Sequence, residues 1–166
     1  MILIARWAYY TDGDYTGKNL SFISQNADGQ SNKAASRKAF EFGLGTTLRA
    51  YQDAGVRLTL ISQVPQQLID PLQAYGRVFA GKANHSDAIK KLSVGYERHR
   101  ELQHFADDVF ARYDVDVVDF SHILCEDNYC PIGTPQESYY FDEDHLSVTG
   151  ARRLLPSITK LIGGAG

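Results

Sequence analysis

The sequence predicts an α/β fold, a three-layer sandwich in which helices cover both faces of a central parallel sheet. Apolar runs near residues 2–4, 57–64 and 115–123 alternate with longer segments whose apolar residues recur at helical spacing. Strands that alternate with helices are typical of parallel sheets covered on both faces. Ligands of such folds bind beyond the carboxyl ends of the strands, so we expect functional residues there.

The chain opens with a predicted strand, because a continuous apolar run is typical of a parallel strand that is buried on both faces. The run consists of Ile2, Leu3 and Ile4. Residues 11–32 are rich in Gly, Asp, Asn and Ser, which indicates a long loop.

A helix is predicted over residues 33–54, because apolar side chains recur on one of its faces. These side chains belong to Phe40, Leu44, Leu48 and Tyr51. Gly55 then marks a turn into a strand at residues 57–64. Pro65 ends that strand, since proline has no N–H for the ladder.

The middle of the chain is predicted to be mainly helical. Residues 67–80 have a weak helical pattern, which Pro71 is expected to interrupt. Residues 86–113 have the length and periodicity of one long helix. A third strand follows at residues 115–123.

The last predicted element is a helix over residues 147–162. Ser147 is its expected N-cap, because a serine hydroxyl accepts a hydrogen bond from the free amides of a first turn. Pro156 lies inside the pattern and predicts a kink or a restart. The apolar stripe consists of Leu154, Leu155, Ile158, Leu161 and Ile162.

Length and composition indicate one globular domain over residues 1–166, with 43% apolar and 22% charged residues. The formal net charge is -3, and acidic neighbours dilute the one basic cluster, so a nucleic-acid interface is excluded. That cluster consists of Lys90, Lys91, Arg98 and Arg100. The apolar runs are far shorter than the ~20 residues of a membrane span, and the first residues lack the basic start of a signal peptide. We therefore expect neither a membrane span nor a signal peptide in this sequence.

The two cysteines, Cys125 and Cys130, lie five positions apart in "LCEDNYC". This spacing is neither a C-x-x-C redox motif nor half of a zinc site. A small disulfide loop fits, with a stabilisation of roughly 2 kcal/mol, and would indicate an oxidising compartment. Spacing alone leaves a second alternative open, two unpaired thiols in a cytosolic loop.

A candidate catalytic pair lies in "YYFDEDHLSVTGA", where Asp142 precedes His145 by three residues. An imidazole abstracts a hydroxyl proton well when a fixed carboxylate holds its other nitrogen in the right tautomer. At this spacing the Asp142 carboxylate can fold back onto the His145 ring. Tyr139 and Tyr140 are expected to shield the pair from water. The alternative is an acidic surface loop with a solvated histidine.

Several motifs together resemble the SGNH hydrolase superfamily, and more closely the SGNH-like domains fused to the C-terminus of bacterial acyltransferase-3 membrane proteins. Those domains have an apolar strand running into A-R-W, a strand ending in Q-V-P, paired cysteines, and a block D-x-x-H-L-S-x-x-G-A. The matching residues are Ala5, Arg6, Trp7, Tyr10, Phe40, Leu44, Thr47, Leu48, Gln63, Val64, Pro65, Cys125, Cys130, Asp142, His145, Leu146, Ser147, Gly150 and Ala151. The resemblance implies an SGNH or flavodoxin-like sheet and favours the disulfide.

The chain departs from this family at the nucleophile. The family's domains begin with a strand ending in G-D-S-H, whose serine is acylated, and this sequence contains no G-D-S. We therefore expect that the family's N-terminal strand and nucleophile segment are missing, and that the chain is a partial domain. Ser31 in "GQSN" is similar to the nucleophile block of some carbohydrate esterases, but it lies in a polar loop and is a minor candidate.

The resemblance implies a carbohydrate O-acyltransferase that transfers acetyl or a similar group to a hydroxyl of a surface polysaccharide, on the periplasmic side of the bacterial inner membrane. His145 would be the general base and acid, and Asp142 its orienting partner. Arg6 and Trp7 are candidate oxyanion or substrate contacts, with core packing as the equal alternative. The implied partners are an acyl donor, a carbohydrate acceptor and an acyltransferase-3 transmembrane domain. No metal or nucleotide cofactor is implied.

Two further functions stay open, a stand-alone esterase with an unrecognised serine and an inactive domain that binds glycans. The absence of the family's first strand also predicts an unpaired apolar edge at the start of the chain. Its residues are Ile2, Leu3, Ile4 and Ala5. Such edges promote self-association.

Overall fold

The computed structural model describes residues 1–15, 21–26, 29, 31–81, 84–126 and 128–163. They form two compact units, each made of two chain segments. The first unit consists of Met1–Gln63 and Arg100–Asp119, and the second of Val64–His99 and Phe120–Gly166. The candidate pair Asp142 and His145 belongs to the second unit, whereas Arg6 and Trp7 belong to the first.

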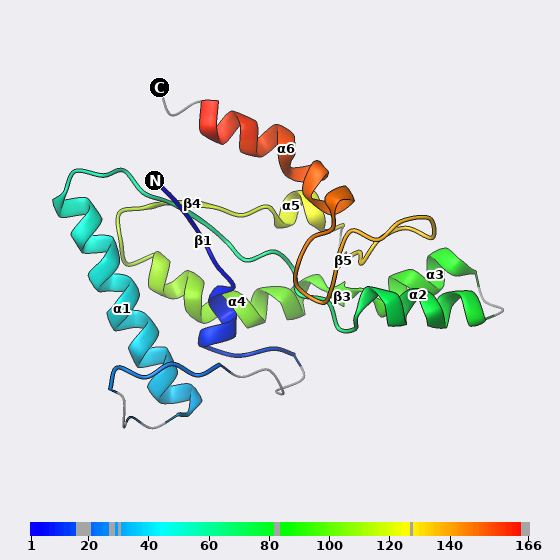
Figure 1. Ribbon diagram of the computed structural model, residues 1–166, viewed down its shortest axis with the longest axis horizontal. Coiled ribbons are helices and arrows are strands. Elements are labelled where there is room, and N and C mark those ends of the chain that lie inside the picture. Colours follow the sequence, from blue (N-terminus) through cyan, green and yellow to red (C-terminus); the bar gives the residue numbers. More distant parts are fainter. Residues whose placement is uncertain (16–20, 27–28, 30, 82–83, 127, 164–166) are drawn as a thin grey trace. The chain divides into compact units, whose positions relative to one another are not determined.

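The first unit contains a sheet of three parallel strands in the order β1-β2-β4 (Figure 1). The strands are β1 Ile2–Ile4, β2 Thr59–Ile61 and β4 Asp116–Val118. Leu3, Leu60 and Val117 lie in one row across the sheet. The predicted α/β class with a parallel sheet is therefore confirmed, although the two later strands are shorter than their apolar runs.

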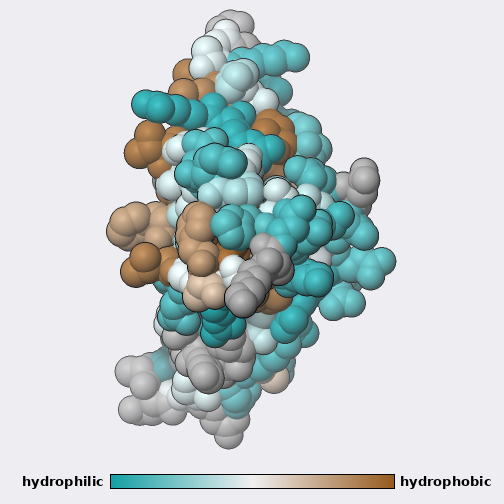
Figure 2. Space-filling view, turned by 90° about the vertical axis from the view of Figure 1, so that its right-hand side faces the viewer, coloured by the Kyte–Doolittle hydropathy of each residue, from teal (hydrophilic) through white to brown (hydrophobic). Residues whose placement is uncertain are grey.

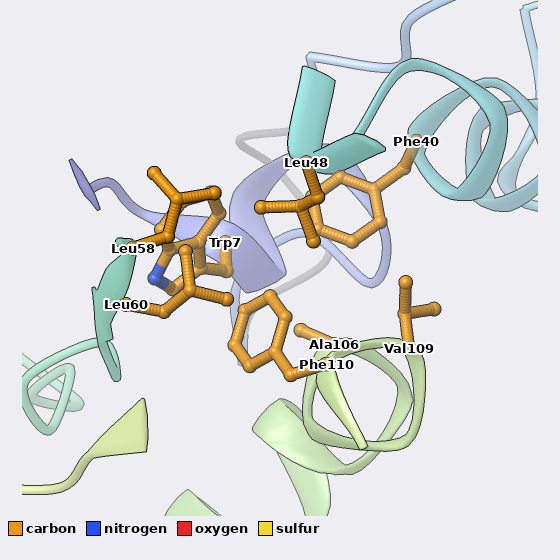
Figure 3. Packing of buried hydrophobic residues seen from close by; sticks show 8 residues of the cluster. All are labelled: Trp7, Phe40, Leu48, Leu58, Leu60, Ala106, Val109 and Phe110. Carbon is orange, nitrogen blue, oxygen red and sulfur yellow. The ribbon is translucent and has the colours of Figure 1, made fainter. Parts of the chain in front are cut away.

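Two helices supply the core beside this sheet, α1 (Lys33–Asp53) and α4 (Tyr96–Phe110). Asn32 caps α1, because its side chain accepts a hydrogen bond of 3.0 Å from the amide of Ala35. Figure 3 shows how the helices and the sheet contribute to one cluster. The buried members are Trp7, Phe40, Leu48, Leu58, Leu60, Ala106, Val109 and Phe110.

Trp7 belongs to this cluster and begins a short 3-10 helix, η1 (Trp7–Tyr10), which is separated from β1 by two residues. Its indole N–H donates a 2.7 Å hydrogen bond to the carbonyl of Ile61 in β2. Its ring meets Phe110 edge to face at 5.2 Å and Phe40 at 6.3 Å between ring centroids (Figure 3). The indole thus fills the core and pairs a backbone carbonyl.

The second unit is mainly helical and includes one antiparallel strand pair. The elements are α2 Pro71–Ala80, α3 His85–Leu92, β3 Val94–Gly95, α5 Ser121–Leu124, β5 Tyr129–Cys130 and α6 Val148–Gly163. α2 and α3 pack side by side (Figure 1). A second apolar cluster holds the unit together and consists of Ala74, Val78, Ile89, Ile132 and Tyr140.

The single long helix predicted over residues 86–113 is wrong. α3 ends at Leu92, and the extended residues Val94–Gly95 pair with Tyr129–Cys130 before α4 begins. Ser93 accounts for part of the break, because its hydroxyl accepts a hydrogen bond of 3.0 Å from the amide of Ile132. A strand partner distant in sequence overrides the local helical pattern here.

Two proline predictions have different outcomes. Pro71 does not interrupt a helix but begins α2, where a missing N–H costs nothing, and the Asp70 side chain accepts from the amide of Gln73 at 3.1 Å. Pro156 lies within α6, which runs as one helix from Val148 to Gly163, so a restart at Pro156 is wrong and a kink stays a prediction.

Within the described residues, no helix is both long and apolar enough to cross a membrane. Figure 2 shows one face of the molecule, where exposed apolar side chains stand in small groups among hydrophilic ones. The most exposed large apolar side chains of the second unit are those of Leu72, Phe79, Phe141, Val148 and Ile162. Phe141 and Val148 flank the candidate pair along the chain.

Candidate active site

Asp142 and His145 contact each other in the tight turn that leads to α6. The Nδ1 atom of His145 lies 2.9 Å from Oδ1 and 2.8 Å from Oδ2 of Asp142. The His145 side chain is 63% exposed, and that of Asp142 is 32% exposed. With Nδ1 held by the carboxylate, Nε2 is the nitrogen that remains to exchange a proton with a substrate.

The backbone of the turn is fixed by the same carboxylate. Asp142 Oδ1 accepts hydrogen bonds from the amides of Asp144 at 3.0 Å and His145 at 2.8 Å. The amide of Phe141 donates to the carbonyl of His145 at 2.7 Å, which closes the turn. One aspartate therefore positions both the imidazole ring and the main chain that carries it.

Hydrogen bonding decides the charge of Asp142. Partial burial alone would raise its pKa, but the Asp144 amide, the His145 ring and the His145 amide together lower that pKa to about 2. Asp142 is therefore a carboxylate at any pH near neutrality.

Asp144 is a neighbour of the ring that the sequence did not reveal as functional. Its Oδ1 lies 2.9 Å from His145 Nδ1, and its side chain is only 9% exposed. The letters D-E-D-H contained the signal, but spacing alone does not say which carboxylate faces the ring. Two carboxylates thus share one imidazole nitrogen.

The ligand atoms of Asp142, Asp144 and His145 lie within 4.8 Å of one another, close enough to hold a metal ion. Both carboxylates already contact Nδ1 of His145, which accounts for the proximity of the three residues without a metal. We therefore interpret the group as a hydrogen-bonded cluster.

Ser147 and Gly150, which follow His145 in the motif, have structural roles. The amide of Ser147 donates to the Tyr139 carbonyl at 2.9 Å, and its hydroxyl donates to the Ser138 carbonyl at 2.7 Å. That hydroxyl also accepts from the Gly150 amide at 3.1 Å, which confirms Ser147 as the N-cap of α6. A Cβ on Gly150 would lie 2.0 Å from the Tyr139 carbonyl oxygen, so only glycine fits there.

The candidate oxyanion residues Arg6 and Trp7 lie at the carboxyl end of β1, in the first unit. The guanidinium of Arg6 lies over the ring of Tyr9, at 4.1 Å from its centroid. The indole N–H of Trp7 is engaged by the Ile61 carbonyl. For Trp7 these contacts match the core-packing alternative.

Ser31, the minor nucleophile candidate, is exposed and directly precedes Asn32, the N-cap of α1, in the first unit. Asp142 and His145 lie in the second unit.

Comparison with known proteins decides the family. The sequence profile of the family described as "SGNH domain (fused to AT3 domains)" matches residues 1–160. The chain belongs to this family. No curated protein matches the chain.

Among solved structures, this SGNH domain is similar to the periplasmic domain of the lipopolysaccharide acetyltransferase of Salmonella ser. Paratyphi A, with a TM-score of 0.54 and 16% identity. The match covers 85% of this chain and 54% of that one, so the chain spans about half the length of the solved domain. At this identity the likeness shows the fold.

Gln67 connects the candidate site of the SGNH domain to its disulfide region, and sequence analysis missed it. Its backbone amide donates to the Glu143 carbonyl, between Asp142 and His145, at 2.6 Å. Its side chain donates to the Cys130 carbonyl at 3.1 Å and accepts from the Val94 amide at 3.2 Å. A buried glutamine with this many partners fixes the segments around it.

The disulfide between Cys125 and Cys130 is present. Between the two cysteines, the amide and carbonyl of Glu126 pair with those of Tyr129, at 2.8 Å and 3.2 Å. Cys130 is fully buried, and its carbonyl is the one that Gln67 binds. The disulfide therefore closes a turn that Gln67 connects, by hydrogen bonds on both sides, to the segment carrying the candidate pair.

Reduction of this disulfide is expected to lower the free energy of unfolding by roughly 2 kcal/mol, the loop-closure value for so short a loop. Urea unfolding followed by circular dichroism, with and without dithiothreitol, measures the difference. A Cys125→Ser/Cys130→Ser variant should have the lower stability in both buffers. An equal stability of the wild type in both buffers would contradict the prediction.

Proposed function

We propose that the chain is the SGNH part of a carbohydrate O-acyltransferase that moves an acetyl or similar acyl group to a sugar hydroxyl of a surface polysaccharide. The serine that carries the acyl group is proposed to come from a segment or chain outside this sequence, because no G-D-S block is present in it. Membership in a family of SGNH domains that are fused to AT3 domains supports an acyltransferase function.

The single observation that carries the proposal is the contact between Asp142 and His145 Nδ1. In the first half-reaction, His145 Nε2 takes the proton of the serine hydroxyl while the serine oxygen attacks the acyl carbonyl. The imidazolium then returns that proton to the group that leaves the donor.

In the second half-reaction, His145 Nε2 again takes a proton from the attacking hydroxyl and returns it to the leaving oxygen. A sugar hydroxyl gives its proton to Nε2 and attacks the acyl-serine, and the serine oxygen leaves with the proton. Asp142 stays ionised throughout and stabilises the imidazolium. Arg6 of the first unit stays a candidate oxyanion or substrate contact.

The proposed location is the periplasmic side of the inner membrane, and an AT3 transmembrane domain is the proposed route for the acyl donor. Two findings support this. The family's members are fused to AT3 domains, and the similar Salmonella structure is a periplasmic domain. The disulfide also fits an oxidising compartment.

The test compares hydrolysis of 4-nitrophenyl acetate by the chain alone with hydrolysis by the chain fused to a segment carrying a G-D-S-H block. We expect the chain alone to match the uncatalysed background and the fusion to exceed it. His145→Ala in the fusion should lower the rate by about 10³-fold or more, since the general base is lost.

Ser31→Ala serves as the matched control and should leave the rate of the fusion unchanged. Activity of the chain alone that disappears in both Ser31→Ala and His145→Ala would instead establish a stand-alone esterase. A folded fusion without any activity would favour the domain that binds glycans without turnover.

The edge of β1 leads to a prediction about association. Among the described residues, β1 pairs with β2 on one side and has no strand on the other. Ile2 and Ile4 are 38% and 68% exposed. We propose that this edge pairs with the serine-bearing segment, and that it joins two copies of the chain when that segment is missing.

Sedimentation velocity should therefore show self-association of the chain alone. Ile4→Lys should reduce the association, because a charge on an edge strand opposes pairing. Phe42→Lys is the control, since Phe42 is 60% exposed on α1 in the same unit. A monomeric wild type, or equal effects of both substitutions, would exclude association through β1.

A further inference from the structure

The second unit contains a hollow of about 160 Å³, and its lining includes none of the residues assigned to catalysis. It lies between α3, the disulfide turn and the segment that follows β5. The charged, aromatic, hydroxyl and proline side chains of its lining include those of Lys90, Glu126, Tyr129, Thr134, Pro135 and Tyr139. Its volume is below the ~300–1,000 Å³ of drug-sized sites, so it fits a ligand of one ring.

The walls of the hollow are held in place before any ligand binds. The disulfide and the backbone pairing of Glu126 with Tyr129 fix one wall. On another wall, the Tyr75 hydroxyl lies 2.5 Å from the Thr134 carbonyl and 2.6 Å from the Glu137 carbonyl. A site that is already ordered loses little conformational entropy on binding.

The polar groups of the hollow offer both hydrogen-bond donors and acceptors. The Lys90 ammonium lies over the ring of Tyr129, at 4.7 Å from its centroid. The Tyr129 hydroxyl donates to Glu126 Oε2 at 2.6 Å, and among the described residues the other carboxylate oxygen is left for a ligand. Lys90 donates only and Glu126 accepts only, so a ligand that bridges them must both accept and donate.

This combination selects a class of ligand. A phosphate or carboxylate ligand would meet the Glu126 charge, which cancels the attraction of Lys90. A sugar hydroxyl accepts from an ammonium and donates to a carboxylate, and the C–H faces of a pyranose ring suit tyrosine and proline surfaces. A neutral saccharide can therefore accept from Lys90, donate to Glu126 and pack a C–H face against the apolar part of the lining.

We propose that this hollow is a saccharide subsite that takes one neutral pyranose ring, with neighbouring hydroxyls on Lys90 and Glu126 and a ring face on Tyr129 or Tyr139. The proposal deepens the proposed function, because such a ring is part of a candidate acceptor. It also places the acceptor on the unit that carries His145.

The hollow is connected to the candidate pair by the main chain. Tyr139 of the lining donates from its amide to the Ile132 carbonyl at 3.0 Å and accepts from the Ser147 amide at 2.9 Å. Residues 139–147 therefore run from the hollow through the turn to α6, and both sites are held by one hydrogen-bonded segment. A saccharide chain bound in the hollow stays attached to the unit that holds the base.

The experiment is a titration of the ¹⁵N-labelled chain with methyl glycopyranosides of glucose, galactose, mannose and rhamnose, read by amide chemical shifts. At least one glycoside should shift amides around Thr134 and Lys90 in a saturable manner, with a dissociation constant on the order of 1 mM. Sorbitol, a polyol without a ring, should not. Because binding is measured without turnover, its failure is distinguishable from a failure of acyl transfer.

Lys90→Gln and Glu126→Gln should each weaken the binding about tenfold, because each loses a charged hydrogen-bond partner. Lys91→Gln is the matched control, since Lys91 is an exposed neighbour on α3 outside the hollow. A longer oligosaccharide of the best sugar should bind at least as tightly if the site takes a ring within a chain. Weaker binding would assign the site to free monosaccharides.

Absence of saturable shifts up to about 50 mM for every glycoside would overturn the proposal, since even a weak single-ring site is detected there. Equal effects of Lys91→Gln and Lys90→Gln would overturn it as well. Unchanged amide spectra of the three variants without ligand show that each is folded.

Discussion

Replacement of Asp142 by asparagine is expected to lower the rate of acyl transfer in the serine-bearing form by roughly 10³-fold. Asparagine keeps an Oδ1 atom that accepts from the amides of Asp144 and His145, so the turn is preserved. Its Nδ2 group, however, donates toward Nδ1 of the ring. A ring that accepts this hydrogen bond carries its proton on Nε2, where it cannot take a proton from serine.

Asp144 limits the size of this loss. Its Oδ1 also contacts Nδ1, so it can hold part of the population in the active tautomer. We therefore expect Asp144→Asn alone to have a small effect and the Asp142→Asn/Asp144→Asn variant to lose about tenfold more than Asp142→Asn. Comparison of kcat and KM for a chromogenic acetyl ester checks this, since loss of the base's orientation lowers kcat. Equal kcat values for wild type and Asp142→Asn would remove Asp142 from the mechanism.

The pH dependence follows from the same contacts. The pKa of Asp142 is depressed to about 2, below the ordinary value of 3.8. The ionised Asp142 therefore stabilises the turn fully at pH values above its ordinary pKa of 3.8. This stabilisation is lost only as the pH falls through the lowered pKa of about 2. Protonation of Asp142 therefore does not account for any fall of activity between pH 5 and 7.

The sequence predicts the parallel sheet, helix α1 of the first unit and the candidate pair, because each depends on local patterns. The apolar run of Ile2, Leu3 and Ile4 fits a strand in any context, and D-x-x-H limits how far Asp142 can lie from His145. The motif residues Ser147 and Gly150 likewise act within a few positions of their partners, as a helix cap and a close backbone approach.

The missed features depend on contacts between distant segments. The break after α3 requires Val94 to meet Cys130, and Gln67 becomes important only because Glu143 and Cys130 come to it. No periodicity in residues 86–113 reveals such partners. The role of Trp7 belongs to the same class, because its hydrogen-bond acceptor lies 54 positions away.

Trp7→Ala is expected to lower the free energy of unfolding by about 3–5 kcal/mol, the usual range for loss of a large aromatic side chain from a core. The substitution removes the ring between Phe40 and Phe110 and leaves the Ile61 carbonyl without its indole donor. With a total stability of roughly 5–15 kcal/mol for a domain, such a loss is a large fraction of the whole. Urea unfolding followed by circular dichroism measures it.

Trp7→Phe separates the two contributions, because phenylalanine keeps an aromatic ring but has no N–H. We expect a loss of about 1–3 kcal/mol from the unpaired carbonyl, in addition to the smaller volume of the ring. Phe42→Ala is the control, since this exposed residue of α1 should change stability by less than about 0.5 kcal/mol. If Trp7→Phe is as stable as wild type yet impairs acyl transfer in the serine-bearing form, the indole N–H acts on the substrate, and the core-packing interpretation of Trp7 is wrong.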